Sequence, residues 1–289
     1  MTLGAIVLCG GRSRRMGRPK AWLPFGNEVL LERVVRLVGA AVSRVVVVGA
    51  ADQELPDLAR DVVIVRDRVA DRGPLQGIEV GLSALPDCVD LAYATATDAP
   101  MLAPAWIGRL AERIGDADLA IPRIGGYLQP LAALYRRSRI LPAVASLLAA
   151  DRLRPAFLVE EVRTTILDED AFRDVDTSLG TLRNLNTPED YRAALGELGL
   201  SPTRVVVEFF GVPRLRAGMA SIVVEANRLG EALRLAAAEC PGLAGTVIFG
   251  RSAHPAYKVS LNGDRFVDDP AMPLVDGDAL LLLAADVGG

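Results

Sequence analysis

The segment LCGGRSRRMGRPK, residues 8–20, places glycines and cations directly after an apolar run. Glycines at such a point free backbone N–H groups to surround a phosphate. The segment also carries five basic side chains and no acid, at Arg12, Arg14, Arg15, Arg18 and Lys20. It is not a Walker loop, because Gly17 is followed by Arg-Pro-Lys rather than by Lys and Ser or Thr. The segment therefore predicts a polyphosphate site.

A solvated basic turn is the alternative interpretation of this segment. Such a turn would not require Gly10, Gly11 and Gly17 to surround the charges at the carboxyl edge of a sheet, which is where open α/β folds bind ligands. We therefore favour the phosphate site.

Asp98 is the candidate metal ligand. It follows the apolar run DLAYATA (90–96), so we expect it at the carboxyl edge of a sheet, beside the first loop. One carboxylate, together with phosphate oxygens and waters, is a usual way to hold Mg²⁺. The alternative is a helix cap, but a cap would be expected nearer Pro104. These residues predict in-line transfer of a nucleotidyl group, which positioning and charge neutralisation promote without a catalytic histidine.

A βα alternation in the first two thirds of the chain must position these residues. Four short, nearly continuous apolar runs indicate strands buried on both faces of a parallel sheet: LGAIVL (3–8), RVVVVG (44–49), DVVIVR (61–66) and DLAYATA (90–96). A further strand is expected at DLAIPRI (118–124), helices at 28–42 and 75–85, and a last helix at 186–198 capped by Asn186 or Thr187. The pattern predicts a doubly wound, mostly parallel α/β fold.

The order of elements changes after GLSPT (199–203), which we interpret as a linker. Two early strands, one helix and two later strands are expected at RVVVEFFG (204–211), SIVVEA (221–226), LGEALRLAAAEC (229–240), AYKVSLNG (256–263) and ALLLLA (279–284). LNGDRF is a turn signal between strand segments. The pattern predicts a small β-grasp α+β domain. The domains are thus expected at 1–198 and 204–289.

Composition excludes several classes of protein. A chain of 289 residues is expected to form two domains. With 51% hydrophobic residues it can build two cores, yet its longest apolar run is too short for a bilayer. No leader is recognisable, and the three cysteines lack a CxxC spacing, so we expect a cytoplasmic protein. The net charge of −4 does not favour nucleic acid as a partner. His254, the single histidine, is predicted to be a surface residue.

The first domain resembles the molybdenum cofactor guanylyltransferases of the MobA type. LCGGRSRRMGRPKAWL matches the opening motif LAGGxSxRMGxxK of the nucleotidyltransferases. Further matching blocks follow in the family's order: RDRVADRGPLQGI (66–78), TDAPML (97–102), LQPLAALY (128–135), FLVEEV (157–162) and LRNLNTPEDY (182–191). The GPLQGI and NLNTPEDY blocks argue against the competing assignment, a nucleotidyltransferase for a sugar or alditol phosphate.

This resemblance implies a reaction and a set of site residues. GTP would react with molybdopterin in the presence of Mg²⁺. The phosphates would be held by Leu8, Gly10, Gly11, Arg15, Gly17 and Lys20. Asp67 would bind the nucleotide and Asp98 the metal, while Gly73, Pro74, Leu75 and Gly77 would form the wall on the side of the base. Asn184 and Asn186 would lie near the pterin, although Asn186 could be only a helix cap, and Glu160 and Glu161 only a solvated helix face.

Two departures from the family's pattern affect these roles. GAADQ (49–53) stands where family members often have asparagine, so guanine and cytosine both remain open as the base. Cys9 replaces the usual alanine, a small apolar exchange for which no catalytic role is expected.

The second domain resembles the sulfur carriers of the MoaD and ThiS type over residues 204–289. The resemblance rests on VVVEFFGVPRLRA, SIVVEA, KVSLNGDRFVDD and MPLVDGDALLLLAADVGG. It implies that an E1-like enzyme adenylates the Gly289 carboxylate, and that the resulting thiocarboxylate donates sulfur in the large subunit of molybdopterin synthase. The tail ADVGG departs from the family's serine-bearing tail, so the partner stays open. The alternatives are a flexible stub and a domain that serves only for docking.

Overall fold

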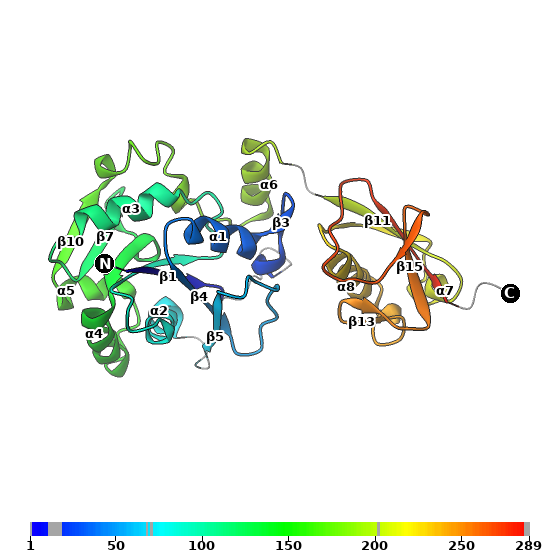
Figure 1. Ribbon diagram of the computed structural model, residues 1–289, viewed down its shortest axis with the longest axis horizontal. Helices are drawn as coiled ribbons and strands as arrows, with labels where there is room; N and C mark the ends of the chain where they lie inside the picture. The colour runs from blue at the N-terminus through cyan, green and yellow to red at the C-terminus, as the bar shows by residue number, and fades with distance from the viewer. Residues whose placement is uncertain (1, 11–18, 68, 70–71, 201–202, 286–289) are drawn as a thin grey trace. The chain divides into compact units, whose positions relative to one another are not determined.

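The computed structural model describes residues 2–10, 19–67, 69, 72–200 and 203–285. The chain divides into two compact units (Figure 1). The first unit comprises Met1–Trp22 and Leu30–Ala194, and the second comprises Leu23–Val29 and Leu195–Gly289. The predicted boundary at residue 198 is close to this division, whereas the separate segment Leu23–Val29 has no counterpart in the sequence-based domain limits.

The first unit is built on one mixed, mostly parallel sheet with the strand order β10-β7-β9-β6-β1-β4-β5. Its strands are β1 (Leu3–Leu8), β4 (Arg44–Ala50), β5 (Val63–Asp67), β6 (Leu91–Ala96), β7 (Leu119–Ile124), β9 (Ala133–Arg136) and β10 (Thr164–Asp168), with β8 (Tyr127–Leu128) paired to β7. Strands β6, β1, β4 and β5 are parallel neighbours, while β9 runs antiparallel to both β6 and β7. The mostly parallel sheet predicted from the apolar runs is thus confirmed, but β9 was not predicted.

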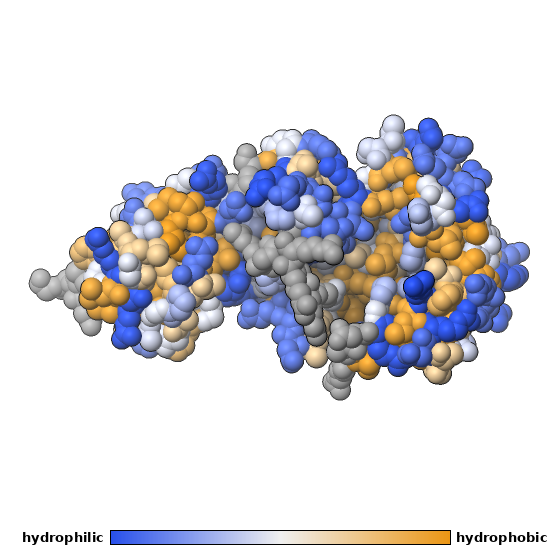
Figure 2. Space-filling view, turned by 180° about the vertical axis from the view of Figure 1, so that it is seen from behind, coloured by the Kyte–Doolittle hydropathy of each residue, from blue (hydrophilic) through white to orange (hydrophobic). Residues whose placement is uncertain are grey.

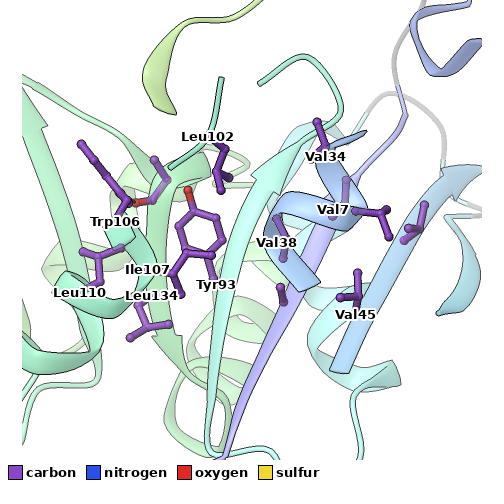
Figure 3. Close-up of a cluster of buried hydrophobic side chains, with 14 of the residues drawn as sticks. Val7, Val34, Val38, Val45, Tyr93, Leu102, Trp106, Ile107, Leu110 and Leu134 are labelled. Atoms are coloured by element: carbon purple, nitrogen blue, oxygen red, sulfur yellow. Dashed lines mark hydrogen bonds between the residues drawn. The ribbon is translucent and has the colours of Figure 1, made fainter. Parts of the chain in front are cut away.

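Helices cover both faces of this sheet, as expected for a doubly wound fold. They are α1 (Leu30–Gly39), α2 (Gly73–Ala84), α3 (Pro104–Arg113), α4 (Arg137–Ala149), α5 (Leu158–Glu161) and α6 (Pro188–Glu197). α1 and α3 contribute to the core on one face, α2 and α4 to the core on the other. Figure 3 shows part of the first core, in which Val34 and Val38 of α1 lie over Val7 and Val45 of the sheet.

The helix expected at 28–42 begins later, at Leu30. Glu28 and Val29 instead form β3 (Glu28–Val29), which pairs antiparallel with β2 (Pro24–Phe25). Gly26, between these strands, has a positive φ of 68°, a conformation that glycine adopts at no steric cost. The second strand of a short hairpin therefore replaces the first two residues of the predicted helix.

Two glycines of α2 let this helix lie close to β1. A Cβ atom on Gly77 would come within 2.9 Å of Leu8 Cδ2, and one on Gly81 would overlap the side chain of Ile6. Side chains at these positions would push the helix away from the sheet. The close packing brings the first turn of α2 next to the end of β1, where the predicted phosphate loop begins.

The second unit holds a five-stranded mixed sheet with the order β12-β11-β17-β15-β16. Its strands are β11 (Arg204–Phe209), β12 (Ser221–Glu225), β15 (Tyr257–Leu261), β16 (Arg265–Val267) and β17 (Ala279–Ala284), with a separate pair formed by β13 (Ile248–Phe249) and β14 (Ser252–Ala253). β11 and β17 are parallel, and the other neighbours are antiparallel.

The helix α8 (Leu229–Glu239) contributes most of its buried residues to the core of this second sheet. The predicted strands and helix are present within a few residues, but α7 (Val212–Ala217), β13, β14 and β16 were not predicted as separate elements. The turn predicted from LNGDRF is confirmed, because Asn262 and Gly263 have φ values of 54° and 75° between β15 and β16. In the described part of the chain, no helix is long and apolar enough to cross a membrane.

Candidate active site

Three polar side chains from distant parts of the sequence meet at the carboxyl edge of the first sheet. Lys20 opens the 3₁₀ turn η1 (Lys20–Trp22), Asp98 follows β6 and Asn186 precedes α6. Lys20 Nζ donates to Asp98 Oδ2 at 2.8 Å and to Asn186 Oδ1 at 3.1 Å. The Lys20 and Asp98 side chains are only 20% and 19% exposed. The structure thus brings together three of the residues that the sequence singles out.

Backbone hydrogen bonds hold Asp98 at this edge. The Thr97 N–H donates to Leu8 O at 3.0 Å, which fixes the end of β6 to the end of β1. The Leu185 N–H donates to Asp98 O at 2.9 Å and so ties the segment before α6 to the same loop. α3 begins at Pro104, with Ala103 at its N-cap and no side-chain cap. Asp98 is therefore no helix cap, as expected, and its carboxylate faces the site.

The start of α6 leaves the Asn186 side chain available to the site. Thr187 caps the helix, because its Oγ1 accepts from the Asp190 N–H at 3.1 Å. The Asp190 carboxylate accepts in return from the N–H groups of Asn186 and Thr187, both at 2.9 Å. These backbone hydrogen bonds, that from Asn186 first, lower the pKa of Asp190. Asn184 is exposed, two residues before Asn186.

A buried carboxylate that was not predicted supports this edge. Asp176 accepts hydrogen bonds from the N–H groups of Gly180 at 2.9 Å and of Thr181 at 2.8 Å. Thr181 Oγ1 in turn accepts from the N–H of Ala103, at the start of α3. The segment DTSLG (176–180) carries the only signal for this loop, an aspartate four residues before a glycine.

The other predicted ligand residues of the first unit lie along the same edge where they are described. Among the described residues, none lies within 4 Å of where a Cβ on Gly10 would be. Asp67 ends β5, and its Oδ1 accepts from the Val69 N–H at 2.9 Å. Gly73, with a φ of 71°, opens α2. Pro74 follows it in the first turn of α2, and Leu75 is fully buried in the core. Gly11, Arg15, Gly17 and Gly289 lie outside the described residues.

The comparisons with known proteins agree with this geometry. Residues 5–164 match the family model of the MobA-like NTP transferase domain. A probable molybdenum cofactor guanylyltransferase from Pelotomaculum thermopropionicum is 32% identical over 187 residues, which cover 64% of this chain and 88% of that protein. The chain belongs to the MobA-like NTP transferase family. The protein is accordingly a nucleotidyltransferase.

Further relatives of the MobA-like domain support the same assignment. A probable molybdenum cofactor guanylyltransferase from Mycobacterium tuberculosis is 35% identical over 198 residues, which cover 67% of this chain and 93% of that protein. The solved structure of molybdopterin-guanine dinucleotide biosynthesis protein A from Archaeoglobus fulgidus covers 68% of this chain and 98% of that one, with a TM-score of 0.55 and 22% identity. This structural likeness shows the fold of the MobA-like domain. The family model assigns nothing beyond residue 164.

Glu160 and Glu161 of the MobA-like domain lie on α5. Both form ion pairs with Arg152, at 2.7 and 2.6 Å. Neither contacts Lys20 or Asp98 in the hydrogen bonds described here. These partly exposed ion pairs agree with the helix-face interpretation.

Cys9 of the MobA-like domain is held in a buried position at the end of β1. Burial raises the pKa of its thiol, and the hydrogen bonds with Thr97 and Gln53 and the charge of Arg66 oppose this only in part. The thiol therefore stays protonated at neutral pH and is a poor nucleophile. This agrees with the interpretation of Cys9 as a small apolar residue.

Replacing Cys9 by alanine is expected to leave turnover within about twofold of the unmodified protein, because the exchange removes a protonated thiol and little volume. Steady-state rates of nucleotidyl transfer measure this directly. The rate of the variant should also keep its pH dependence between pH 6 and 9. A loss of a hundredfold or more would show that the thiol takes part in the reaction.

Proposed function

We propose that the MobA-like domain transfers GMP from GTP to molybdopterin and releases pyrophosphate. The observation that carries the proposal is the contact of Lys20 with Asp98 and Asn186 at the carboxyl edge of the sheet. The relatives named above are probable molybdenum cofactor guanylyltransferases. In this proposal, Lys20 supplies a cation for phosphate oxygens, Asp98 a carboxylate for the metal ion, and Asn186 a carboxamide for the second substrate.

The chemical step is an in-line displacement at the α-phosphorus of GTP. A phosphate oxygen of molybdopterin attacks this phosphorus, the bond to the bridging oxygen of the β-phosphate breaks, and pyrophosphate leaves with that electron pair. Lys20 holds the phosphate oxygens and offsets the charge that builds up on them. Its carboxylate and carboxamide partners fix the direction of the ammonium group, so little reorientation is needed when the nucleotide binds.

Lysine suits this position better than arginine. Lys20 and Lys258 are the only lysines of the sequence, although it contains 32 Lys and Arg residues together. An ammonium group is a compact point charge that can approach phosphate oxygens between two neighbours, whereas a guanidinium is a wider planar fork. The Lys20 ammonium meets both Asp98 and Asn186 with its one nitrogen atom.

The residues present fit a magnesium ion. Asp98 offers a partly exposed carboxylate whose Oδ2 contacts Lys20. Among the described residues, no group of three or more acidic, histidine or cysteine side chains could hold a metal ion by itself. Magnesium prefers such a sparse site, with one or two carboxylates, substrate phosphates and waters. When bound, the ion would neutralise charge on the triphosphate.

The experiment is to incubate the full chain with Mg²⁺, molybdopterin and either GTP or CTP, and to identify the products by mass spectrometry. We expect the guanine dinucleotide of the pterin, together with pyrophosphate, from GTP. A cytosine dinucleotide formed faster from CTP would assign the protein to the cytidylyltransferases. Transfer of either nucleotide to a sugar phosphate but not to molybdopterin would contradict the proposal.

For the second unit we propose a β-grasp sulfur carrier. The sheet order β12-β11-β17-β15-β16, with parallel β11 and β17 at its centre and α8 on one face, supports the β-grasp arrangement that the sequence predicts. In the proposed reaction, the Gly289 carboxylate attacks the α-phosphorus of ATP on an E1-like enzyme and pyrophosphate leaves. Sulfide from a sulfur donor then attacks the carbonyl carbon of the acyl adenylate, the bond to the AMP oxygen breaks, and AMP leaves to give the thiocarboxylate.

Exposed apolar side chains on the second unit support a role in binding a partner protein. Leu215 of α7 is 82% exposed and Phe266 of β16 is 65% exposed. Phe210, Leu215 and Met219 line a cavity of about 620 Å³. Figure 2 shows such apolar surface among polar residues on one face of the molecule. The large subunit of molybdopterin synthase is the partner that this proposal implies.

The sulfur-carrier proposal is tested on the full chain with ATP, a sulfur donor and an E1-like enzyme from the same organism. Intact-protein mass spectrometry should show the gain expected when sulfur replaces one oxygen. Deleting Gly289 should abolish this gain while guanylyl transfer and thermal stability stay unchanged. A deletion variant that still supports sulfur transfer would leave the docking function as the better description.

A further inference from the structure

Arg66, at the end of β5, is held in a fixed position beside β4. It pairs in register with Gly49, and its Nη1 lies 2.6 Å from where a Cβ on Gly49 would be. The same Nη1 donates to Gln53 O at 2.7 Å and to Ala50 O at 3.3 Å. A glycine opposite the arginine therefore makes room for the guanidinium at the carboxyl edge of the sheet.

The loop that holds Arg66 is itself tied to the start of the phosphate loop. Gln53 Nε2 donates to Cys9 O at 2.9 Å, and Gln53 Oε1 accepts from the Ala50 N–H at 3.1 Å. The carboxamide thus closes the turn after β4 against the end of β1. Because Arg66 binds two carbonyls of this turn, its guanidinium is oriented before any ligand arrives.

The strand order sets the distance between Arg66 and the phosphate-binding end of the site. Strands β6, β1, β4 and β5 are consecutive neighbours, so three spacings, about 14 Å in total, separate the ends of β6 and β5. Asp98 follows β6, and Arg66 lies next to the last residue of β5. This separation is comparable to the length of an extended nucleoside triphosphate. If the triphosphate lies at Lys20 and Asp98, a nucleotide that extends along this edge can therefore reach β5 with its base.

Within the described part of the chain, the hydrogen bonds of the Arg66 guanidinium run only through Nη1. Arg66 is partly exposed, so Nε and Nη2 can meet a ligand at the edge. A guanidinium fork matches the O6 and N7 acceptors of guanine. Cytosine and adenine present an amino group in the corresponding place, which would face the fork donor to donor.

We propose that Arg66 selects guanine by donating hydrogen bonds to O6 and N7 of the nucleotide base. This inference rests on the proposed nucleotidyl transfer and names the residue that sets its base preference. The segment GAADQ (49–53) departs from the family's pattern in this region. In this inference, its Gln53 positions Arg66 and does not contact the base.

The test is equilibrium binding of GTP, CTP and 7-deaza-GTP to the full chain in the presence of Mg²⁺. The unmodified protein should bind GTP more tightly than CTP, and 7-deaza-GTP, which lacks the N7 acceptor, more weakly than GTP. Arg66→Ala should weaken GTP binding by roughly 5- to 150-fold, the range for a bidentate arginine–guanine pair. It should leave CTP binding almost unchanged and abolish the difference between GTP and 7-deaza-GTP.

Arg44→Ala is the matched control, since Arg44 begins β4 at the opposite edge of the sheet. It should alter neither affinity. Arg66→Glu adds a second variant, which should favour CTP because a carboxylate accepts from the cytosine amino group. Thermal unfolding checks that both Arg66 variants are folded, and the 7-deaza comparison on the unmodified protein needs no variant.

Three outcomes would overturn the inference. An unmodified protein that binds GTP and 7-deaza-GTP equally does not use N7. A folded Arg66→Ala variant that keeps its preference for GTP does not select guanine through Arg66, although the proposed transfer reaction stands. An unmodified protein that binds neither GTP nor CTP contradicts the proposed function itself and the inference with it.

Discussion

Replacing Lys20 by alanine is expected to slow nucleotidyl transfer by about 10²- to 10⁴-fold. The ammonium group contacts both Asp98 and Asn186, and in the proposed reaction it offsets charge on the phosphates as the α-phosphorus is attacked. Because the side chain is partly exposed and its ion pair is near solvent, we expect thermal stability to change little. Single-turnover rates with GTP, Mg²⁺ and molybdopterin measure the effect without interference from product release.

Lys258→Ala is the matched control, because Lys258 is the only other lysine and is exposed on β15 of the second unit. It should leave transfer unchanged. Lys20→Arg keeps the charge but widens the cation, so it should recover only part of the activity. A normal turnover rate of the Lys20→Ala variant would contradict the proposed catalytic role of Lys20.

Replacing Asp98 by asparagine is expected to cause a loss of similar size, about 10²- to 10⁴-fold, through the metal. Asparagine has the same shape but no charge, so the backbone contact with Leu185 can persist while Mg²⁺ loses the carboxylate that we propose as its ligand. The distinguishing readout is a titration of the rate with Mg²⁺. The variant should need a much higher concentration for half-maximal activity.

Asp116→Asn serves as the control for Asp98, since Asp116 is exposed and lies before β7, at the other edge of the sheet. Its rate and its magnesium requirement should equal those of the unmodified protein. If Asp98→Asn and the unmodified protein had the same magnesium dependence, the ion would bind elsewhere, and Asp98 would act only by orienting Lys20.

The local pattern of the sequence was sufficient to predict most elements of the fold. The run LGAIVL forms β1 with the predicted limits. A continuous apolar stretch is stable as a strand where both faces of the sheet are buried. β9 was missed because ALYR is short and its antiparallel direction depends on its two neighbours rather than on its own residues. The helix start at residue 28 was wrong for a similar reason, since pairing with β2 overrides helix propensity there.

The candidate site was predictable only in part. Lys20 and Asp98 follow strands, and the carboxyl ends of parallel strands share one edge, so their proximity could be expected. The hydrogen bond between Lys20 and Asn186 joins residues 166 positions apart, and no spacing rule indicates it. Asp176 and Arg66 act through backbone groups that only the folded chain brings within reach. Such contacts carry almost no signal in a single sequence.

The place of β17 in the second sheet also bears on how the protein is made. This strand is the last of its unit in chain order but lies between β11 and β15. During synthesis, the edges of β11 and β15 that pair with β17 therefore stay unpaired until residues 279–284 have left the ribosome. Unpaired strand edges can form hydrogen bonds with other chains. The MobA-like domain precedes them and can fold first. A chain that terminates before Ala279 would therefore carry a folded MobA-like domain and an incomplete second sheet. We expect this incomplete sheet to aggregate and to be cleaved by proteases.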